Sequence, residues 1–224
     1  MLELILVLVL IPMLLAFAIT AFGISQVKAL SSHKSALTPV DIDDEQKELN
    51  DMGEFIDWAD ANGFVWIDAY RATFPGIALK PLVLAWQRDD GTYLTAYKMG
   101  NAVACDLLTS FDEQGESVLT TSRTKSGQPH PSYPTAYTQV FPSVDLDTLL
   151  RHHHEALAFL QTRMGKHPHA TSMPFEAFFL HVLRQQMLYI RTIPVWQLRF
   201  TYWWLRRHRF KNIPVTQKYD FNFG

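Results

Sequence analysis

The hydrophobic pattern is densest at the N-terminus of the chain. Of residues 1–23, 19 are hydrophobic, and residues 4–22 carry no charged side chain. This uncharged run comes close to the about 20 residues that an α-helix needs to cross the hydrocarbon layer of a membrane. The pattern predicts a transmembrane anchor over residues 1–23, followed by a mostly polar linker over residues 24–40.

Two other interpretations of the apolar run are a cleaved signal peptide and a buried core helix. Ala16, Ala18 and Ala21 are small residues of the kind that precede a signal-peptidase site. However, the first cations, Lys28 and Lys34, follow the run instead of preceding it. Positive charge favours the cytoplasmic side of a membrane. We therefore expect a single-pass protein of the cell membrane, with its N-terminus outside and its C-terminal domain in the cytoplasm.

The pattern over residues 41–173 predicts an α+β domain. Residues 43–62 have apolar side chains at helical spacing and end at Asn62-Gly63, a sequence that suits a helix C-terminus. Short apolar runs bounded by turn residues then predict five or six strands, at residues 64–70, 81–88, 93–99, 101–111, 117–122 and 136–141. Because the connections look too short for crossovers, we expect an antiparallel meander.

A second helix follows the strands. Ser143 or Asp145 is a suitable N-cap, and apolar residues then repeat at helical spacing to about Met164. This helix should lie across the apolar face of the sheet. The order helix, strands, helix predicts a two-layer domain in which the meander sheet is packed by helices.

The C-terminal tail, residues 174–224, is apolar, aromatic and basic together. Pro194 should divide it into two amphipathic helical pieces, because proline lacks a backbone donor. Such helices are typical of the headgroup zone of a membrane, and they are equally suited to packing on the domain or on another subunit. The residues predicted to form this membrane or partner interface are Arg184, Arg191, Trp196, Arg199, Tyr202, Trp203, Trp204, Arg206 and Arg207.

Composition and charge sharpen this division of the chain. The whole sequence is 48% hydrophobic with a net charge of -2, which excludes a disordered polymer. The charge is divided unevenly, with -8 over residues 35–60 and +6 over residues 174–224. Such asymmetry indicates a charged surface or partner, and anionic lipid or a protein partner fits a basic tail beside an anchor. Nucleic acid is a poor fit for a membrane-anchored chain.

Candidate catalytic chemistry is sparse. Cys105 is the only cysteine, so an intramolecular disulfide is excluded, and strand alternation places its thiol on the buried face. His152, His153 and His154 are consecutive in the predicted helix and point about 100° apart, so they cannot hold one ion together. We expect no metal and no cofactor. His153 lies on the apolar stripe, where it would be a core histidine or would line a pocket.

The sequence therefore favours a membrane-anchored binding or scaffold module over an enzyme. Its cytoplasmic α+β domain would contact a partner protein or lipid through the tail. One alternative is a hydrophobic-ligand carrier or acyl-processing enzyme, with a cavity between the sheet and the helix that begins at Asp145. A less favoured alternative is a metal-dependent hydrolase that uses the histidines.

Overall fold

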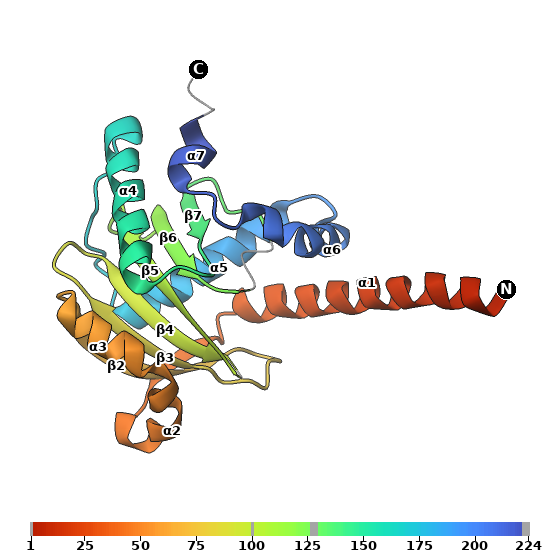
Figure 1. Ribbon diagram of the computed structural model, residues 1–224, viewed down its shortest axis with the longest axis horizontal. Helices are drawn as coiled ribbons and strands as arrows, with labels where there is room; N and C mark the ends of the chain where they lie inside the picture. The colour runs from red at the N-terminus through yellow and green to blue at the C-terminus, as the bar shows by residue number, and fades with distance from the viewer. Residues whose placement is uncertain (1, 100, 126–129, 221–224) are drawn as a thin grey trace.

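The computed structural model describes residues 2–99, 101–125 and 130–220, which form an α+β fold around a seven-stranded sheet (Figure 1). The strands follow chain order across the sheet. They are β1 (Ala36–Pro39), β2 (Val65–Thr73), β3 (Leu82–Gln87), β4 (Tyr93–Met99), β5 (Ala102–Ser110), β6 (Val118–Arg123) and β7 (Ala136–Val140).

Neighbouring strands are antiparallel except β6 and β7, which run parallel. The predicted meander is confirmed from β2 to β6 and wrong for the last pair. A parallel pair needs a connection of about a dozen residues, and residues 124–135 supply one. Residues 126–129 of this connection lie outside the described residues.

The segment predicted as a linker over residues 24–40 is largely regular structure. Helix α1 (Leu2–Leu30) continues beyond residue 23, and β1 extends the sheet by pairing with β2, where Leu37 lies opposite Ala72. Leu37 is buried, so the short strand belongs to the core. Met1, in the predicted anchor, and residues 221–224, in the predicted tail, lie outside the described residues.

The acidic segment predicted as one helix over residues 43–62 is broken into short turns. It consists of η1 (Ile42–Glu45), α2 (Gln46–Leu49), η2 (Asn50–Met52) and α3 (Gly53–Ala61). Gly53, at the junction of η2 and α3, weakens a continuous helix because glycine loses the most backbone freedom on folding. The apolar side of the segment is nevertheless used as predicted, since Met52, Phe55 and Ala59 are buried in the core.

Helices cover both faces of the sheet, so the prediction of two layers is wrong. Helices α3 and α4 (Leu146–Met164) pack on one face, where Leu149 joins Trp86 and Leu107 in a core cluster. Helix α5 (Phe175–Thr192) packs on the opposite face, where Phe178 meets Tyr93 with ring centroids 5.3 Å apart. The three layers are α3 and α4, the sheet, and α5 (Figure 1).

The predicted break at Pro194 is confirmed. Helix α5 ends at Thr192 and α6 (Trp196–Arg206) begins after Val195, whose positive φ of 50° turns the chain. The chain then forms η3 (Arg207–Phe210) and α7 (Val215–Asp220). The tail is thus part of the folded body, because α5 supplies one layer of the core.

Helix α1 is long and apolar enough to cross a membrane. Its Leu10–Leu30 segment has a mean hydropathy of 1.9, and only 17% of the apolar window is buried in the structure. The N-terminal part projects away from the body (Figure 1), whereas Ile19 and Val27 pack against α5 and α6. The N-terminal part of the helix therefore projects from the body, and the part from Ile19 to Val27 packs on it.

Candidate functional site

A cavity of about 340 Å³ lies between the sheet and α5. Its walls are mostly apolar, with Phe179 and Val182 from α5 facing Leu108 and Val118 from the sheet. The described residues that line it are Leu30, Tyr97, Asp106, Leu108, Val118, Thr120, Ser122, Thr124, His130, Tyr133, Ala136, Thr138, Val140, Phe179, Val182, Leu183, Gln186 and Met187. We refer to this space as the α5 cavity.

Asp106 supplies the carboxyl group of the α5 cavity. Its Oδ1 accepts a hydrogen bond from Ser122 Oγ at 2.5 Å, and its Oδ2 accepts one from Tyr97 Oη at 3.2 Å. Burial raises the pKa of the carboxyl to about 6, although both hydrogen bonds favour the charged form. The same carboxyl, together with burial, raises the pKa of the Tyr97 hydroxyl well above its usual range.

Two further polar side chains border the α5 cavity. Burial lowers the pKa of His130 to about 4, so its imidazole is neutral near pH 7. Tyr133 is only 8% exposed, and its hydroxyl has no hydrogen-bond partner among the described residues. Buried polar atoms are usually satisfied, so an exception beside a cavity needs an explanation.

Sequence reasoning did not single out Asp106, because strand alternation placed only the face of Cys105 in the core. Cys105 and Leu107 do face the α3 and α4 layer as predicted, and Asp106 and Leu108 point the other way. That second face is covered by α5 and is not open to solvent. The signal that could have revealed this is β3, where Leu82 to Trp86 form an unbroken apolar run, the pattern of a strand buried on both sides.

His153, the predicted pocket residue, lies in a closed core. It is 0% exposed, and both ring nitrogens bond to threonine hydroxyls, Nε2 to Thr109 at 2.9 Å and Nδ1 to Thr121 at 2.8 Å. Gln139 Nε2 donates to the Thr121 hydroxyl at 2.8 Å. Burial lowers the pKa of His153 to about 3, so the ring is neutral. His153 is thus a buried residue whose two ring nitrogens are both satisfied.

The remaining candidates for chemistry are structural or isolated. Cys105 is fully buried, and burial raises the pKa of its thiol to about 12, far from the range of a reactive thiolate. Within the described parts of the chain, no group of three or more His, Cys, Asp or Glu side chains is placed to hold a metal ion.

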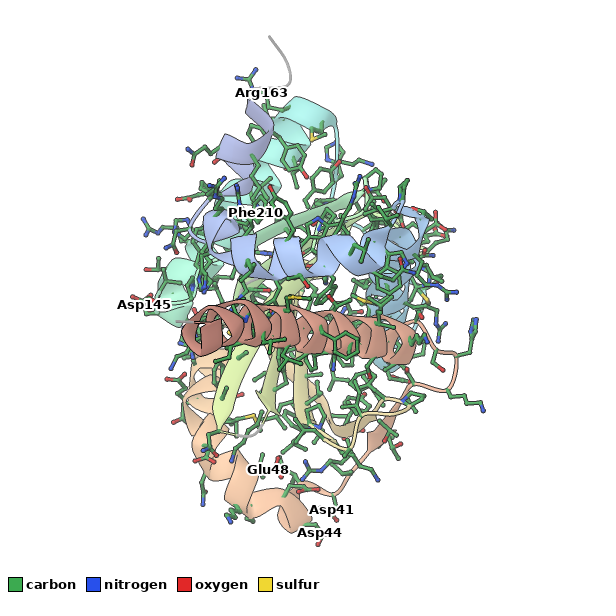
Figure 2. All side chains as sticks on the ribbon, turned by 90° about the vertical axis from the view of Figure 1, so that its right-hand side faces the viewer. Asp41, Asp44, Glu48, Asp145, Arg163 and Phe210 are labelled. Atoms are coloured by element: carbon green, nitrogen blue, oxygen red, sulfur yellow. The ribbon has the colours of Figure 1, made fainter. Side chains whose placement is uncertain are left out.

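The acidic segment forms ion pairs with the sheet. Glu45 and Glu48 both pair with Arg71 on β2, with a distance of 2.8 Å between Glu48 Oε1 and Arg71 Nη2. Asp51 pairs with Lys98 and Glu54 with Arg123. Figure 2 shows Asp41, Asp44 and Glu48 on one side of α1 and Phe210, in the basic η3 segment, on the other side. The charge separation in the sequence is therefore also a separation in space.

The predicted interface residues divide between two settings. Trp196 is buried against α1 in the cluster with Ile19, Val27 and Phe200, and Arg191 lies nearby at the end of α5. Arg199 and Tyr202 are exposed on α6, Trp203 and Trp204 are partly buried, and Arg184 is a partly buried residue of α5. Arg206 lies over the ring of Tyr202 and Arg207 over that of Trp204, at 5.0 and 3.6 Å from the ring centroids.

Helices α1 and α6 are held together by close contacts. The hydroxyls of Thr20 and Thr201 are 2.7 Å apart, and Thr201 also donates to the carbonyl of Ala16 at 3.2 Å. A Cβ atom on Gly23 would overlap the ring of Phe200, so only glycine permits this approach. The order of contacts along both helices shows that α6 runs antiparallel to α1.

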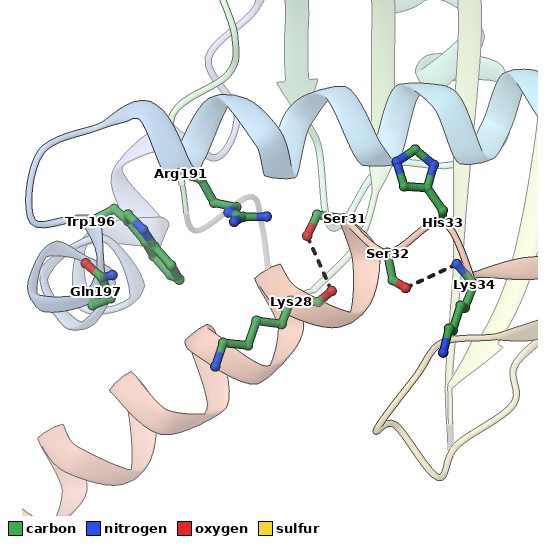
Figure 3. A pocket seen from close by; sticks show the side chains of 8 residues that line it. All are labelled: Lys28, Ser31, Ser32, His33, Lys34, Arg191, Trp196 and Gln197. Atoms are coloured by element: carbon green, nitrogen blue, oxygen red, sulfur yellow. Dashed lines mark hydrogen bonds between the residues drawn. The ribbon is translucent and has the colours of Figure 1, made fainter.

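A second, larger pocket of about 670 Å³ lies where α1 joins the body. Figure 3 shows Lys28 from α1 and Arg191 from α5 on either side of it, with Trp196 and Gln197 from the start of α6. The remaining lining residues are Ser31, Ser32, His33 and Lys34. We refer to it as the basic pocket, since Lys28, Lys34 and Arg191 give it three permanent cations and its lining contains no acidic side chain among the described residues.

Comparison of the chain with protein-family models, with curated proteins and with solved structures finds no match.

Proposed function

We propose that the protein is anchored in the cell membrane by α1 and binds anionic lipid headgroups at the membrane surface through the basic pocket. The observation that carries the proposal is the position of the pocket, at the end of the one described helix that is apolar enough to span a bilayer. The protein would act there as a binding module whose body is held against the membrane.

The exposed surface of α1 supports its role as an anchor. Leu14, Phe17 and Phe22 are 65%, 74% and 56% exposed, an arrangement that is unfavourable in water and suited to lipid. The helix rises 1.5 Å per residue, so a hydrocarbon layer of about 30 Å would be filled by about 20 residues. If the span begins near Leu4, where the uncharged run starts, Lys28 would lie about 6 Å beyond the hydrocarbon edge, in the headgroup zone.

Helix α6 supports a position at the membrane surface. It packs beside the inner half of α1, and its exposed side carries Leu198, Tyr202 and Leu205. Aromatic rings beside arginines are typical of the headgroup zone. Each cation near an anionic surface contributes about 1 kcal/mol. The start of α6, at Trp196 and Gln197, and the basic pocket would therefore contact the same layer of lipid.

The packing of α1 disfavours cleavage as a signal peptide. A cut near Ala21 would remove Ile19 and Thr20, which cover Phe200 and bond to Thr201. The cluster between α5 and α6 would lose part of its apolar cover. The cluster between α1, α5 and α6 is therefore intact only when α1 is retained.

The proposed orientation places the body in the cytoplasm, because Lys28 and Lys34 follow the span and positive charge favours that side. Protease added to intact right-side-out cells should leave a C-terminal tag uncut, and disruption of the membrane should expose it. Digestion of the tag in intact cells, with a cytoplasmic marker still protected, would overturn the orientation.

Lipid binding can be tested on the full chain in detergent with short-chain phosphatidylglycerol and phosphatidylcholine. Wild-type protein should bind the anionic lipid at least ten times more tightly. Lys28→Gln with Arg191→Gln should lose about 2 kcal/mol of that preference, from two cations at about 1 kcal/mol each. Lys166→Gln with Arg163→Gln removes the same charges at the far end of α4 and should change nothing.

Two outcomes would contradict the lipid proposal. One is equal binding of the two lipids by wild-type protein. The other is an equal loss in the test pair and the control pair, which would indicate a nonspecific charge effect. Either result would favour the alternative that the exposed side of α6 docks a partner protein.

A further inference from the structure

The α5 cavity has the size and wall chemistry of a small-molecule site. Ligand pockets are commonly about 300–1,000 Å³ and combine apolar walls with a few placed polar groups. The α5 cavity, at about 340 Å³, fits the small end of this range. The wall from α5 is formed by Phe179, Val182, Leu183 and Met187 with one polar residue, Gln186. Such walls favour a ligand with a compact apolar body.

The charge inside the α5 cavity is negative and uncompensated. Asp106 is the one carboxyl in the described lining, and that lining contains no lysine or arginine. Two cations on the neighbouring strands turn to the other face, where Lys98 pairs with Asp51. Arg123 pairs with Glu54 there and lies over Phe55. A partly desolvated carboxylate is costly unless a cation or several donors meet it.

The groups that face Asp106 from each neighbouring element are neutral near pH 7. Tyr97 on β4 and Ser122 on β6 donate to it, and α5 presents no titratable side chain to the cavity. The loop before β7 contributes His130 and Tyr133, the former with a pKa of about 4. None of these groups supplies the positive charge that the carboxylate lacks.

The hydrogen bonds of Asp106 leave room for a ligand. A carboxylate has about four acceptor positions, and the two recorded donors, Ser122 Oγ and Tyr97 Oη, occupy one on each oxygen. An ammonium group has three donors and forms strong charge-assisted hydrogen bonds with a carboxylate. The hydroxyls of Thr120 and Thr138, which also line the cavity, are further acceptors for such a group.

We propose that the α5 cavity binds a small organic amine, with its ammonium group on Asp106 and its apolar body between α5 and the sheet. An alcohol would gain the apolar contacts without the charge pair. A carboxylate would be repelled by Asp106. This inference is independent of lipid binding in the basic pocket, because the two sites share no lining residue.

The test uses the full chain in detergent with three aromatic probes of similar size, benzylamine, benzyl alcohol and benzoate. Ligand-observed NMR measures the binding of each probe. Benzylamine should bind most tightly and benzoate should not bind. Asp106→Asn should weaken benzylamine at least tenfold and leave benzyl alcohol unchanged. Asp60→Asn, a matched change at an exposed position of α3, should leave all three unchanged.

Wild-type protein provides a test that does not depend on the folding of a variant. Benzylamine stays cationic between about pH 5 and 7.5, while Asp106 becomes protonated as the pH falls through about 6. Benzylamine should therefore bind about ten times more weakly at pH 5 than at pH 7.5. In return, bound benzylamine should lower the pKa of Asp106. NMR of the isotope-labelled carboxyl carbon of Asp106 measures this pKa.

Binding of benzoate as tight as that of benzylamine would overturn the proposal. So would benzylamine binding that does not change between pH 5 and 7.5, or an Asp106 titration that the amine leaves unmoved. Detergent without protein, measured with the same probes, corrects for partition of the amine into micelles.

Discussion

The two faces of the sheet each bury a titratable side chain, but the two side chains differ in hydrogen bonding and in enclosure. On the α4 face, His153 has a hydroxyl on each ring nitrogen and is sealed from solvent. On the α5 face, Asp106 borders a cavity and retains free acceptor capacity. A polar group that is fully satisfied and enclosed contributes to stability, whereas one left open beside a cavity is available to a ligand.

The network on the α4 face also extends to the C-terminal helix. Thr109 Oγ1 lies 3.0 Å from Thr92 Oγ1, and Gln139 Oε1 accepts a hydrogen bond from the backbone N–H of Val215 at 2.9 Å. Strands β5 to β7, α4, α7 and Thr92, which precedes β4, are thereby joined through buried polar atoms. Networks of this kind are favourable only when every member is satisfied.

The largest effect should come from breaking the closed face at His153. His153→Ala would leave the hydroxyls of Thr109 and Thr121 without their partner and open a cavity, so the free energy of unfolding should fall by about 3 kcal/mol. Urea denaturation of the full chain in detergent, followed by tryptophan fluorescence, measures this. His167→Ala, at an exposed position, is the control and should stay within about 0.5 kcal/mol. An equally small change at His153 would show that the network is not stabilising.

The second largest effect on the free energy of unfolding should come from adding side-chain volume, and it should differ between the two faces. Ala156 on α4 is 1% exposed in a packed cluster, so Ala156→Leu should cost about 1–3 kcal/mol through overpacking. Val182→Leu extends into the α5 cavity and should change the free energy of unfolding by less than about 1 kcal/mol. The same urea denaturation compares them. Equal losses would show that the α5 cavity has no space for an added methylene.

The third and smallest effect is a pH dependence of opposite sign on the two faces. The pKa of Asp106 is raised in the fold, so its contribution to stability is present at low pH and is lost as the pH rises through about 6. Asp106→Asn should therefore stabilise the protein by about 1 kcal/mol at pH 7.5, after allowance for partial solvent exposure, and by much less at pH 4.

His153 should act in the reverse direction. Its pKa is lowered in the fold, so its contribution is complete above about pH 6.5 and is lost as the pH falls towards 3. Urea denaturation at pH 4 and pH 7.5 separates the two residues. Greater stability of Asp106→Asn at pH 4 than at pH 7.5, relative to wild type, would contradict the assignment for Asp106.

Much of the fold follows from local pattern in the sequence. The strands from β2 to β7 and the helix capped by Asp145 lie within a few residues of their predicted positions, because alternation, turn residues and caps are local signals. The break at Pro194 is local in the same sense. His153 could be assigned to the core because it lies on the apolar stripe of its helix.

The features that the sequence did not predict depend on contacts between segments that are distant in the chain. The α5 cavity exists because residues 175–192 return to cover the second face of the sheet, and β1 forms because residues 36–39 pair with β2. The basic pocket joins Lys28 to Arg191, which lie far apart in the sequence. Its residues were partly predicted as an interface, but their convergence on one pocket required the fold.

The contacts between α1 and α6 set an order of assembly during synthesis. Thr20 and Thr201 are separated by 181 positions, so α6 leaves the ribosome long after its partner α1. At about 5–20 residues per second, α1 would wait roughly 10–40 s for α6. During that interval the inner half of α1 is not covered by α6. A ribosome that stops before residue 196 releases a chain in which Trp196 is missing from the basic pocket.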